Sequence, residues 1–446
     1  MPYMRKILVL ALLVAFLPSC GGSEDNKNEV TIPVPIDKST IEPTVARLLY
    51  KTGNDVQLNI NDPNKWMVYG SALFANAYYN EAAIALRHAI TIKPEMPQAT
   101  YLLATVLWKA NRKEEAVEEL QTALALIPEY DMGWRLLAQW QLERGDTAEA
   151  EVSARRAFEL NSGRIGTRYI LALCLMDDGR YDEALPLLEE AIDMNAPPWI
   201  YTLAGNCYRQ LGMSEQAKQA LEQSGPPFVD WPDPMFKHIP NLIAGKAELA
   251  EYAMHIYKNR GPQKAKPFLI RAFQINPEHV NVRVALSIAL QSEGQLEQAK
   301  RLLKELQGEP NTNYWKQYAG ICIGRNELKE AQEHISKAIF MDMSDANAHD
   351  IAAVIATQQG DNEEACRQRE QAGMLYVEEK QWEKAELSLA YAYELGVMNI
   401  QSMQAFALAQ IELEHYPQAR TTIRSLLDID PNNPRALEYQ RRIPTE

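Results

Sequence analysis

Residues 69–94 and 103–128 decide the fold of this chain. They read YGSALFANAYYNEAAIALRHAITIKP and LATVLWKANRKEEAVEELQTALALIP, and they align without a gap at a spacing of 34 residues. The matching positions are Gly70, Leu73, Ala82, Leu86, Ala89 and Pro94 in the first copy and Ala104, Leu107, Ala116, Leu120, Ala123 and Pro128 in the second. Self-similarity at such a period is the signature of a repeat architecture.

The spacing within each copy predicts two helices joined by a turn. Large residues three or four positions apart form one apolar stripe, and small residues between them let paired helices approach closely. Proline then ends the second helix, because it lacks an N–H group and clashes with the preceding turn. We expect Pro94, Pro128, Pro277 and Pro431 to close second helices in this way.

The same skeleton recurs as far as Pro431. Further copies are marked by Ala138, Ala172, Gly205, Ala253, Ser287, Ala319, Ala353, Gly373 and Ala407. The copy at Ala372-Gly373 begins too early after Ala365, so we expect one helix there to be shared between two repeats. Residues 434–446 are charged, as suits a solvent-facing cap on a stack of repeats.

The pattern resembles that of the tetratricopeptide repeat (TPR) family, W-x2-L-G-x2-Y, then A-x3-F, then P. The resemblance implies an all-α superhelix, a TPR solenoid of about ten helix-turn-helix repeats. It also implies that the first helix of each repeat lines a concave groove that binds a peptide or a partner helix. The residues that would face this groove are Met67, Phe74, Tyr101, Trp108, Arg135, Tyr169, Met176, Asn206 and Arg209. Packing against neighbouring helices inside the superhelix is the alternative for each of them.

The repeats are interrupted over residues 225–245, where prolines prevent a continuous helix. Phe228, Trp231 and Phe236 are unfavourable in water, so this stretch must pack on something. In one interpretation it is an ordered crossover that places its aromatic side chains on the flanking helices and bends the solenoid. In the other it is a docking loop that reaches into the groove or into a partner, and these three residues then count as partner-binding.

The N-terminus has the features of a secretion signal. Arg5 and Lys6 precede an unbroken apolar run over residues 7–17, and Leu-Pro-Ser-Cys-Gly follows at residues 17–21. This resembles a bacterial lipobox, which implies cleavage before Cys20 and lipidation of its thiol. The alternative is an ordinary secretory signal in which Cys20 is incidental. The apolar run is too short to span a bilayer, which takes ~20 residues, so we expect the lipid to hold the protein in the cell envelope, at the outer membrane.

The predicted organisation follows the chain in order. It comprises a signal peptide (1–19), a lipidated cysteine with a tether (20–62), an N-terminal array (63–224), the interruption (225–245), a C-terminal array (246–433) and a cap (434–446). The net charge of −14 argues against nucleic acid as a partner. Cys174, Cys207, Cys322 and Cys366 show no C-x-x-C spacing and are interpreted as small core residues, with a disulfide left open.

No catalytic motif stands in a suitable context, and no metal or cofactor is expected. Acidic pairs such as Glu114-Glu115 alternate with apolar residues on helix surfaces, which indicates solubility and local ion pairs. The lysine and asparagine clamp of Hsp90-type TPR proteins is not matched at Met67, Ser71, Tyr101 or Thr105. We therefore predict a membrane-anchored, non-enzymatic scaffold that binds protein or peptide partners in the envelope. The alternative is a glycan-binding lipoprotein similar to the SusD type.

Overall fold

The computed structural model describes residues 31–35, 41–225, 233–396 and 398–444. Within these ranges the chain forms 24 α-helices and no strand. The predicted all-α superhelix of about ten repeats is thereby confirmed. None of the helices in these ranges combines the length and the apolar character needed to cross a bilayer.

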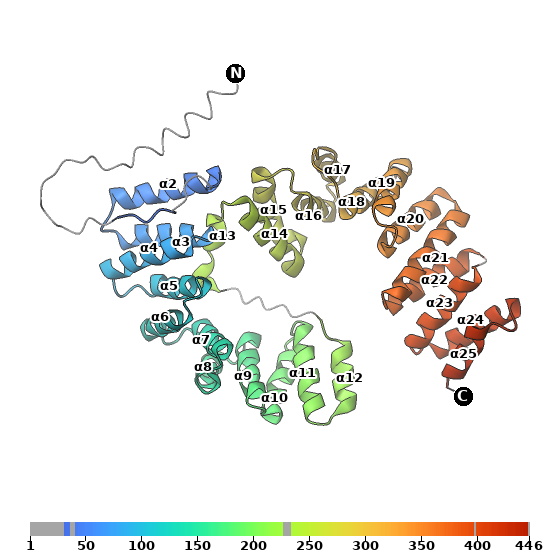
Figure 1. Cartoon of the computed structure of the whole chain (residues 1–446), viewed down its shortest axis with the longest axis horizontal. Helices are drawn as coiled ribbons and strands as arrows, with labels where there is room; N and C mark the ends of the chain where they lie inside the picture. The colour runs from blue at the N-terminus through green and yellow to red at the C-terminus, as the bar shows by residue number, and fades with distance from the viewer. Residues whose placement is uncertain (1–30, 36–40, 226–232, 397, 445–446) are drawn as a thin grey trace, which may run out of the picture.

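Five helix pairs form the N-terminal array: α3 (Pro63–Ala75) with α4 (Tyr79–Ile92), α5 (Pro97–Lys109) with α6 (Lys113–Leu126), α7 (Asp131–Arg144) with α8 (Thr147–Leu160), α9 (Ile165–Asp177) with α10 (Tyr181–Asp193), and α11 (Trp199–Gln210) with α12 (Ser214–Glu222). In Figure 1 they follow an arc, and from α5 to α10 the first helix of each pair lies on its inner side. We call the surface formed by α3, α5, α7, α9 and α11 the concave face.

The C-terminal array contains α14 (Lys246–Arg260) with α15 (Pro262–Ile275), α16 (Val280–Ser292) with α17 (Leu296–Lys304), α18 (Thr312–Gly324) with α19 (Leu328–Met341), α20 (Ala346–Gln359) with α21 (Asn362–Glu378), α22 (Trp382–Leu395), and α23 (Ile400–Glu412) with α24 (Tyr416–Ile429). Helix α21 packs against both α20 and α22, which confirms the shared helix. The last helix, α25 (Pro434–Arg442), packs on α23 and α24.

Proline marks helix ends as expected. Pro94, Pro128, Pro277 and Pro431 each stand two residues beyond the last residue of α4, α6, α15 and α24. The second helices therefore end before the position at which the proline ring would remove a backbone hydrogen bond.

Successive pairs are also joined by a hydrogen bond that recurs at one repeat position. The side chains of Trp66, Trp134, Arg283 and His349 each pair with the backbone carbonyl six residues earlier, those of Ile60, Pro128, Pro277 and Met343. The start of a first helix is thus fixed to the chain that leaves the preceding helix. An indole, a guanidinium and an imidazole all fill the position, because what it needs is a donor of sufficient reach.

Glycine is used where two helices of a pair come closest. A Cβ atom built on Gly373 would lie 2.3 Å from Cγ of Leu389, and one on Gly70 would lie 2.7 Å from Cγ of Leu86. Contacts this short force the helices or the leucine to shift. These residues therefore set the separation of α21 from α22 and of α3 from α4.

Replacing Gly373 with alanine is expected to lower the free energy of unfolding by about 1–3 kcal/mol, because overpacking outweighs the gain in helix propensity. Gly320 in α18 is the matched control, since no atom outside its own helix lies within 4 Å of its Cβ position. There the same substitution is expected to stabilise by up to about 1 kcal/mol. Urea denaturation of both variants measures the two signs, and a stabilised Gly373→Ala protein would contradict this packing.

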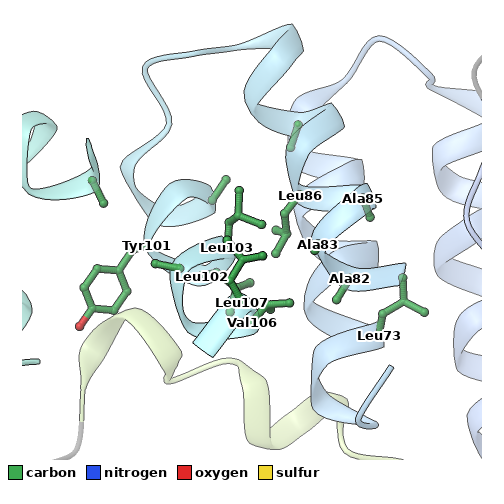
Figure 2. Close-up of a cluster of buried hydrophobic side chains, with 14 of the residues drawn as sticks. Leu73, Ala82, Ala83, Ala85, Leu86, Tyr101, Leu102, Leu103, Val106 and Leu107 are labelled. Carbon is green, nitrogen blue, oxygen red and sulfur yellow. The ribbon is translucent and has the colours of Figure 1, made fainter. Parts of the chain in front are cut away.

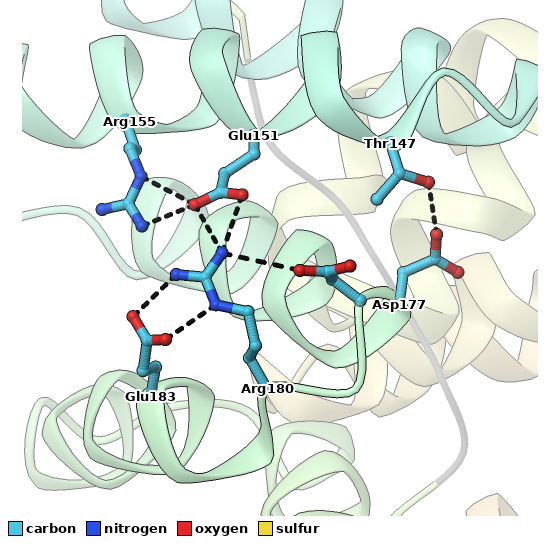
Figure 3. A network of polar contacts seen from close by, with 7 residues as sticks. Thr147, Glu151, Arg155, Asp177, Arg180 and Glu183 are labelled. Atoms are coloured by element: carbon cyan, nitrogen blue, oxygen red, sulfur yellow. Dashed lines mark hydrogen bonds and ion pairs between the residues drawn. The ribbon is translucent and has the colours of Figure 1, made fainter.

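Ion pairs connect neighbouring second helices on the outer side of the arc. Arg180, which precedes α10, donates from Nη1 to both carboxylate oxygens of Glu151 on α8, at 3.0 and 2.9 Å, and from Nε to Glu183 at 2.7 Å (Figure 3). The hydrogen bonds from Arg180 lower the pKa of Glu183, so this carboxylate stays charged. Such exposed pairs contribute little to stability, because solvent screens them. These acidic groups therefore serve as contacts between helices.

The tether predicted over residues 20–62 needs a correction. Residues 43–58 form α2 (Pro43–Leu58), which buries Val45, Leu49 and Val56 against α3. These apolar residues recur at helical spacing, and the nearby prolines stand before the helix or at its first position, where proline is tolerated. Pro33 also accepts a hydrogen bond from the Tyr69 hydroxyl at 2.5 Å. Residues 20–30 lie outside the described residues.

Candidate partner-binding face

The concave face of the N-terminal array is covered in part by the chain itself. After α12 the chain returns to the beginning of the array, where α13 (Ile239–Leu242) packs against α3 and the short 3₁₀ helix η2 (Pro234–Phe236) packs against α5 (Figure 1). We call residues 233–245 the internal segment. It lies across α3, α5 and the start of α7.

Two tyrosines receive the acidic end of the internal segment. The Tyr101 hydroxyl donates to Oδ2 of Asp233 at 2.7 Å, and the Tyr130 hydroxyl donates to Oδ1. The same Oδ1 accepts the backbone N–H of Met235 at 2.9 Å, which caps η2. Burial, followed by the charge of Asp233, raises the pKa of Tyr101, so this phenol remains a donor at neutral pH.

A buried arginine adds positive charge to this end of the site. Arg135, on α7, is 5% exposed, and its Nη1 donates to Oε1 of Gln139 at 3.2 Å. Burial lowers the pKa of Arg135, and the negative charge of Asp233 opposes that effect. The carboxylate of Asp233 is thus held by two neutral donors within the field of a cation, an arrangement that favours an acidic group over a neutral one.

Aromatic and aliphatic side chains of the segment pack beside this polar contact. The ring centroids of Phe236 and Tyr101 are 5.4 Å apart, and Ile239 is buried in the core of the first repeats. Figure 2 shows the Tyr101 ring turned away from Leu103 and Leu107, with its hydroxyl toward the ribbon of the segment. Tyr101 is 0% exposed, so the segment and the neighbouring helices cover it completely.

Asn76, at the end of α3, holds the other end of the segment. Its Nδ2 donates to the carbonyls of Ala72 at 2.8 Å and Leu242 at 2.9 Å, and its Oδ1 accepts the N–H groups of Ala244 at 2.8 Å and Gly245 at 3.0 Å. All four hydrogen-bonding positions of the amide are therefore filled.

The residues that hold the segment depart from the repeat pattern. At a spacing of 34 residues, Tyr101 corresponds to Met67 and to Arg135, and Asn76 corresponds to Ala110. Repeat stacking does not need these side chains, because the neighbouring repeats stack without them. Tyr101, Arg135 and Asn76 therefore belong to a binding arrangement added to the repeat.

The structure places the predicted groove residues in two groups. Tyr101 contacts the internal segment and Arg135 lies within the range of the Asp233 charge, and both are buried, as the packing alternative expected. Met67 and Phe74 are half-buried and pack against the core of the first repeats. The second group comprises Trp108 at the end of α5, Tyr169 and Met176 on α9 and Asn206 on α11, which are half-buried, and Arg209 on α11, which is exposed. Phe228, Trp231 and Cys20 lie outside the described residues.

The second group also packs within the array. Trp108 stacks on Trp140 with ring centroids 4.6 Å apart, and Tyr169 meets Trp199 edge to face at 4.8 Å. Arg209 donates to Asn206 at 2.9 Å. These side chains are prearranged by their neighbours and still present an edge to solvent.

The described part of the interruption makes contacts beyond its flanking helices, which the crossover interpretation did not expect. Phe236 packs on Tyr101 of α5, more than a hundred residues earlier in the chain, and Arg271 of α15 donates to the carbonyls of Pro240 and Ile243 at 2.9 and 2.7 Å. The described part of the interruption is thus bound between the concave face and the first pair of the C-terminal array. Phe236 was predicted from the sequence as a contact residue, whereas Asn76, Tyr130 and Asp233 were not.

One cluster in the described residues brings together groups that can ligate a metal. Single ligand atoms of Cys322, Glu330 and His334 lie within 4.8 Å of one another, although sequence spacing had not joined them. Lys300 Nζ already donates to Glu330 at 2.6 Å, and burial raises the pKa of Cys322 to about 12. A thiol held neutral and a carboxylate held by lysine favour an ion pair beside a packed core over a metal centre.

The comparisons with known proteins bear on the repeats. Family models described as tetratricopeptide repeat match residues 73–139, 175–234 and 259–317, and a second such model matches residues 135–198. The chain is a tetratricopeptide-repeat protein. The repeat family predicted for this TPR protein is thus confirmed. Among curated proteins no match was found.

Several solved structures are similar to the TPR protein at low identity. The MamA protein is 19% identical over 38% of this chain and 98% of its own, with a TM-score of 0.34. A TPR protein from Parabacteroides merdae is 12% identical over 70% of this chain and 99% of its own, with a TM-score of 0.27. YrrB, described as a TPR protein with an unusual peptide-binding site, is 14% identical over 47% and 98%, with a TM-score of 0.25.

Proposed function

We propose that this protein is a non-enzymatic scaffold that binds peptide segments of protein partners on its concave face. The observation that carries the proposal is the internal segment, which this face holds through a carboxylate contact, an aromatic contact and backbone contacts. A surface that makes all three kinds of contact with one stretch of chain has the means to recognise peptide. The later first helices, from α7 to α11, offer prearranged aromatic edges for the same purpose.

The proposed place of action is the cell envelope. The support is the sequence of residues 1–21, where a cationic start and a short apolar run precede Cys20. A lipidated Cys20 would hold the array at a membrane, and the outer membrane is the proposed address. The scaffold would there concentrate components of an assembly, secretion or maturation process.

Replacing Cys20 with serine is expected to release the protein from the membrane fraction of its native host, because the thiol that carries the lipid is lost. Replacing Cys366 with serine is the control, since this half-buried thiol belongs to α21. Fractionation with immunoblotting measures the distribution. Membrane association that survives Cys20→Ser would show that Cys20 is not the anchor.

Photo-crosslinking in cells tests the scaffold itself. A photoreactive amino acid at Trp108 or Arg209 reports on the concave face, and one at Val152, which is 69% exposed on α8, reports on a second helix. We expect one or two envelope proteins, identified by mass spectrometry, to be captured repeatedly from the first two positions and not from Val152. Equal capture from all three positions, or none from Trp108 and Arg209, would contradict the proposal.

A further inference from the structure

The internal segment resembles a bound peptide more than a piece of core. Its side chains alternate between contact and solvent, with Asp233, Met235, Phe236, His238 and Ile239 at least half-buried and Pro234, Lys237 and Asn241 exposed. Ser71 Oγ lies 3.2 Å from Nε2 of His238, which adds a polar contact on α3. The contacting positions therefore define a recognition pattern, an acidic residue followed at short spacing by an apolar residue, an aromatic residue and a β-branched residue.

The contacts of the internal segment also join residues that are unusually far apart in the sequence. Helices of this protein pack mainly on the next one or two helices, as expected of a solenoid. The bonds from Tyr101 to Asp233 and from Asn76 to Leu242 span 132 and 166 residues. A connection that served only to continue the solenoid would need no carboxylate held by two hydroxyls on α5 and at the start of α7.

We propose that the internal segment is a resident ligand of the concave face, and that protein partners carrying an acidic residue ahead of an apolar-aromatic pair displace it. This inference rests on the proposed scaffold function and names the class of peptide that the scaffold recognises. The cationic and hydroxyl-rich end formed by Tyr101, Tyr130 and Arg135 receives the partner's carboxylate. The Tyr101 ring receives its aromatic side chain.

The resident ligand also sets the affinity for partners. A segment tethered within the same chain competes at an effective concentration in the millimolar range. An external peptide binds only the fraction of molecules whose face is free, so its apparent dissociation constant rises by the inverse of that fraction. Weakening the internal copy must therefore tighten the binding of an identical external copy.

The test uses the full chain and a fluorescein-labelled peptide of residues 233–243, DPMFKHIPNLI, with binding followed by fluorescence anisotropy. The double variant Asp233→Ala, Phe236→Ala weakens the internal copy and leaves the face intact. We expect it to bind the peptide about tenfold more tightly than the unaltered protein, or better. Lys237→Ala with Asn241→Ala is the matched control, because both positions are exposed, and it should bind as the unaltered protein does.

A second comparison locates the site. Adding Tyr101→Phe and Tyr130→Phe to the double variant keeps both rings and removes both hydroxyls, so this protein should bind the peptide about tenfold more weakly than the double variant does. A peptide with asparagine in place of its aspartate should lose affinity for the double variant in the same way. Circular dichroism checks each fold. If the double variant does not fold, Asp233→Asn replaces it, because asparagine keeps the size of the side chain and removes its charge.

Equal affinity for the unaltered and the double-variant protein, or no binding to either, would overturn the resident-ligand proposal and leave the segment as a structural connection. Partners crosslinked at Trp108 in that case would leave the scaffold standing without this recognition pattern. Tight peptide binding without any crosslinked partner would retain the resident ligand and remove the support for a scaffold in the envelope.

Discussion

Replacing Asn76 with alanine is expected to lower the free energy of unfolding by about 3 kcal/mol, at about 1 kcal/mol for each of three partners left unpaired. The side chain is 5% exposed, and its loss removes the partners of the Leu242 carbonyl and of the Ala244 and Gly245 N–H groups. These groups lie at the junction of the internal segment and α14. The contact between the first repeat and the C-terminal array should weaken with them.

Two measurements test the expected loss of stability in Asn76→Ala. Denaturation of the whole chain gives the loss of stability, and hydrogen exchange at Ala244 and Gly245 shows whether it is confined to the junction. Asn259→Ala is the matched control, because that side chain makes one exposed, local hydrogen bond to the carbonyl of His255 on α14, and a change within about 0.5 kcal/mol is expected. Unchanged exchange at Ala244 and Gly245 in Asn76→Ala would mean that the amide does not hold the junction.

The repeat position of Asn76 explains why we expect Asn76→Ala to affect the internal segment specifically. The corresponding residue of the next repeat is Ala110, where the helix ends with its backbone N–H bonded to Val106 and with no side-chain amide. The end of a first helix therefore does not need asparagine. The Asn76 amide instead binds the internal segment, which lies outside the repeats. Asn76→Ala removes these hydrogen bonds and introduces the residue type that the next repeat has at this position.

The sequence predicts the helix pairs well because their causes are local. The 34-residue spacing places Leu73, Ala82 and Leu86 on facing stripes, and the early copy at Gly373 indicates the shared helix α21. Each of these relations links residues of one pair or of adjacent pairs. Helix α2 was missed because it is a single helix that follows no repeat, and only the spacing of Val45, Leu49 and Val56 signals it.

The candidate site is predictable only in part, because its contacts are distant in the chain. Residue type and repeat position indicate Tyr101, Arg135 and Phe236 as binding residues, but they do not indicate that Phe236 packs on Tyr101. The repeat period does not indicate where a stretch outside the repeats, such as the internal segment, packs on the array. A usable signal was nevertheless present, since Asn76 is a polar residue at the position where the next repeat has Ala110. A polar residue that departs from the repeat pattern in this way indicates a side chain that binds a part of the chain outside the stacked repeats.

Replacing Arg283 with alanine is expected to have the largest effect on stability, a loss of about 4 kcal/mol from unpaired carbonyls and a cavity together. Arg283, in α16, is 1% exposed. It donates from Nε at 3.0 Å and from Nη2 at 2.7 Å to the carbonyl of Pro277, and from Nη1 to the carbonyl of Leu302. One side chain thus joins the end of α15, the start of α16 and the end of α17.

The repeat itself supplies the rescue experiment for Arg283. Trp66 occupies the same repeat position and donates to the carbonyl of Ile60 at 2.8 Å. Arg283→Trp therefore retains one donor for the Pro277 carbonyl, and it loses the second bond to Pro277 and the bond to Leu302. Its loss of stability should fall well below that of Arg283→Ala, while Arg301→Ala at an exposed position of α17 should change stability by no more than about 0.5 kcal/mol. Because a solenoid can unfold in parts, hydrogen exchange across α15 to α17 should accompany denaturation. Equal losses for the tryptophan and alanine variants would show that the recurring hydrogen bond does not stabilise the junction between repeats.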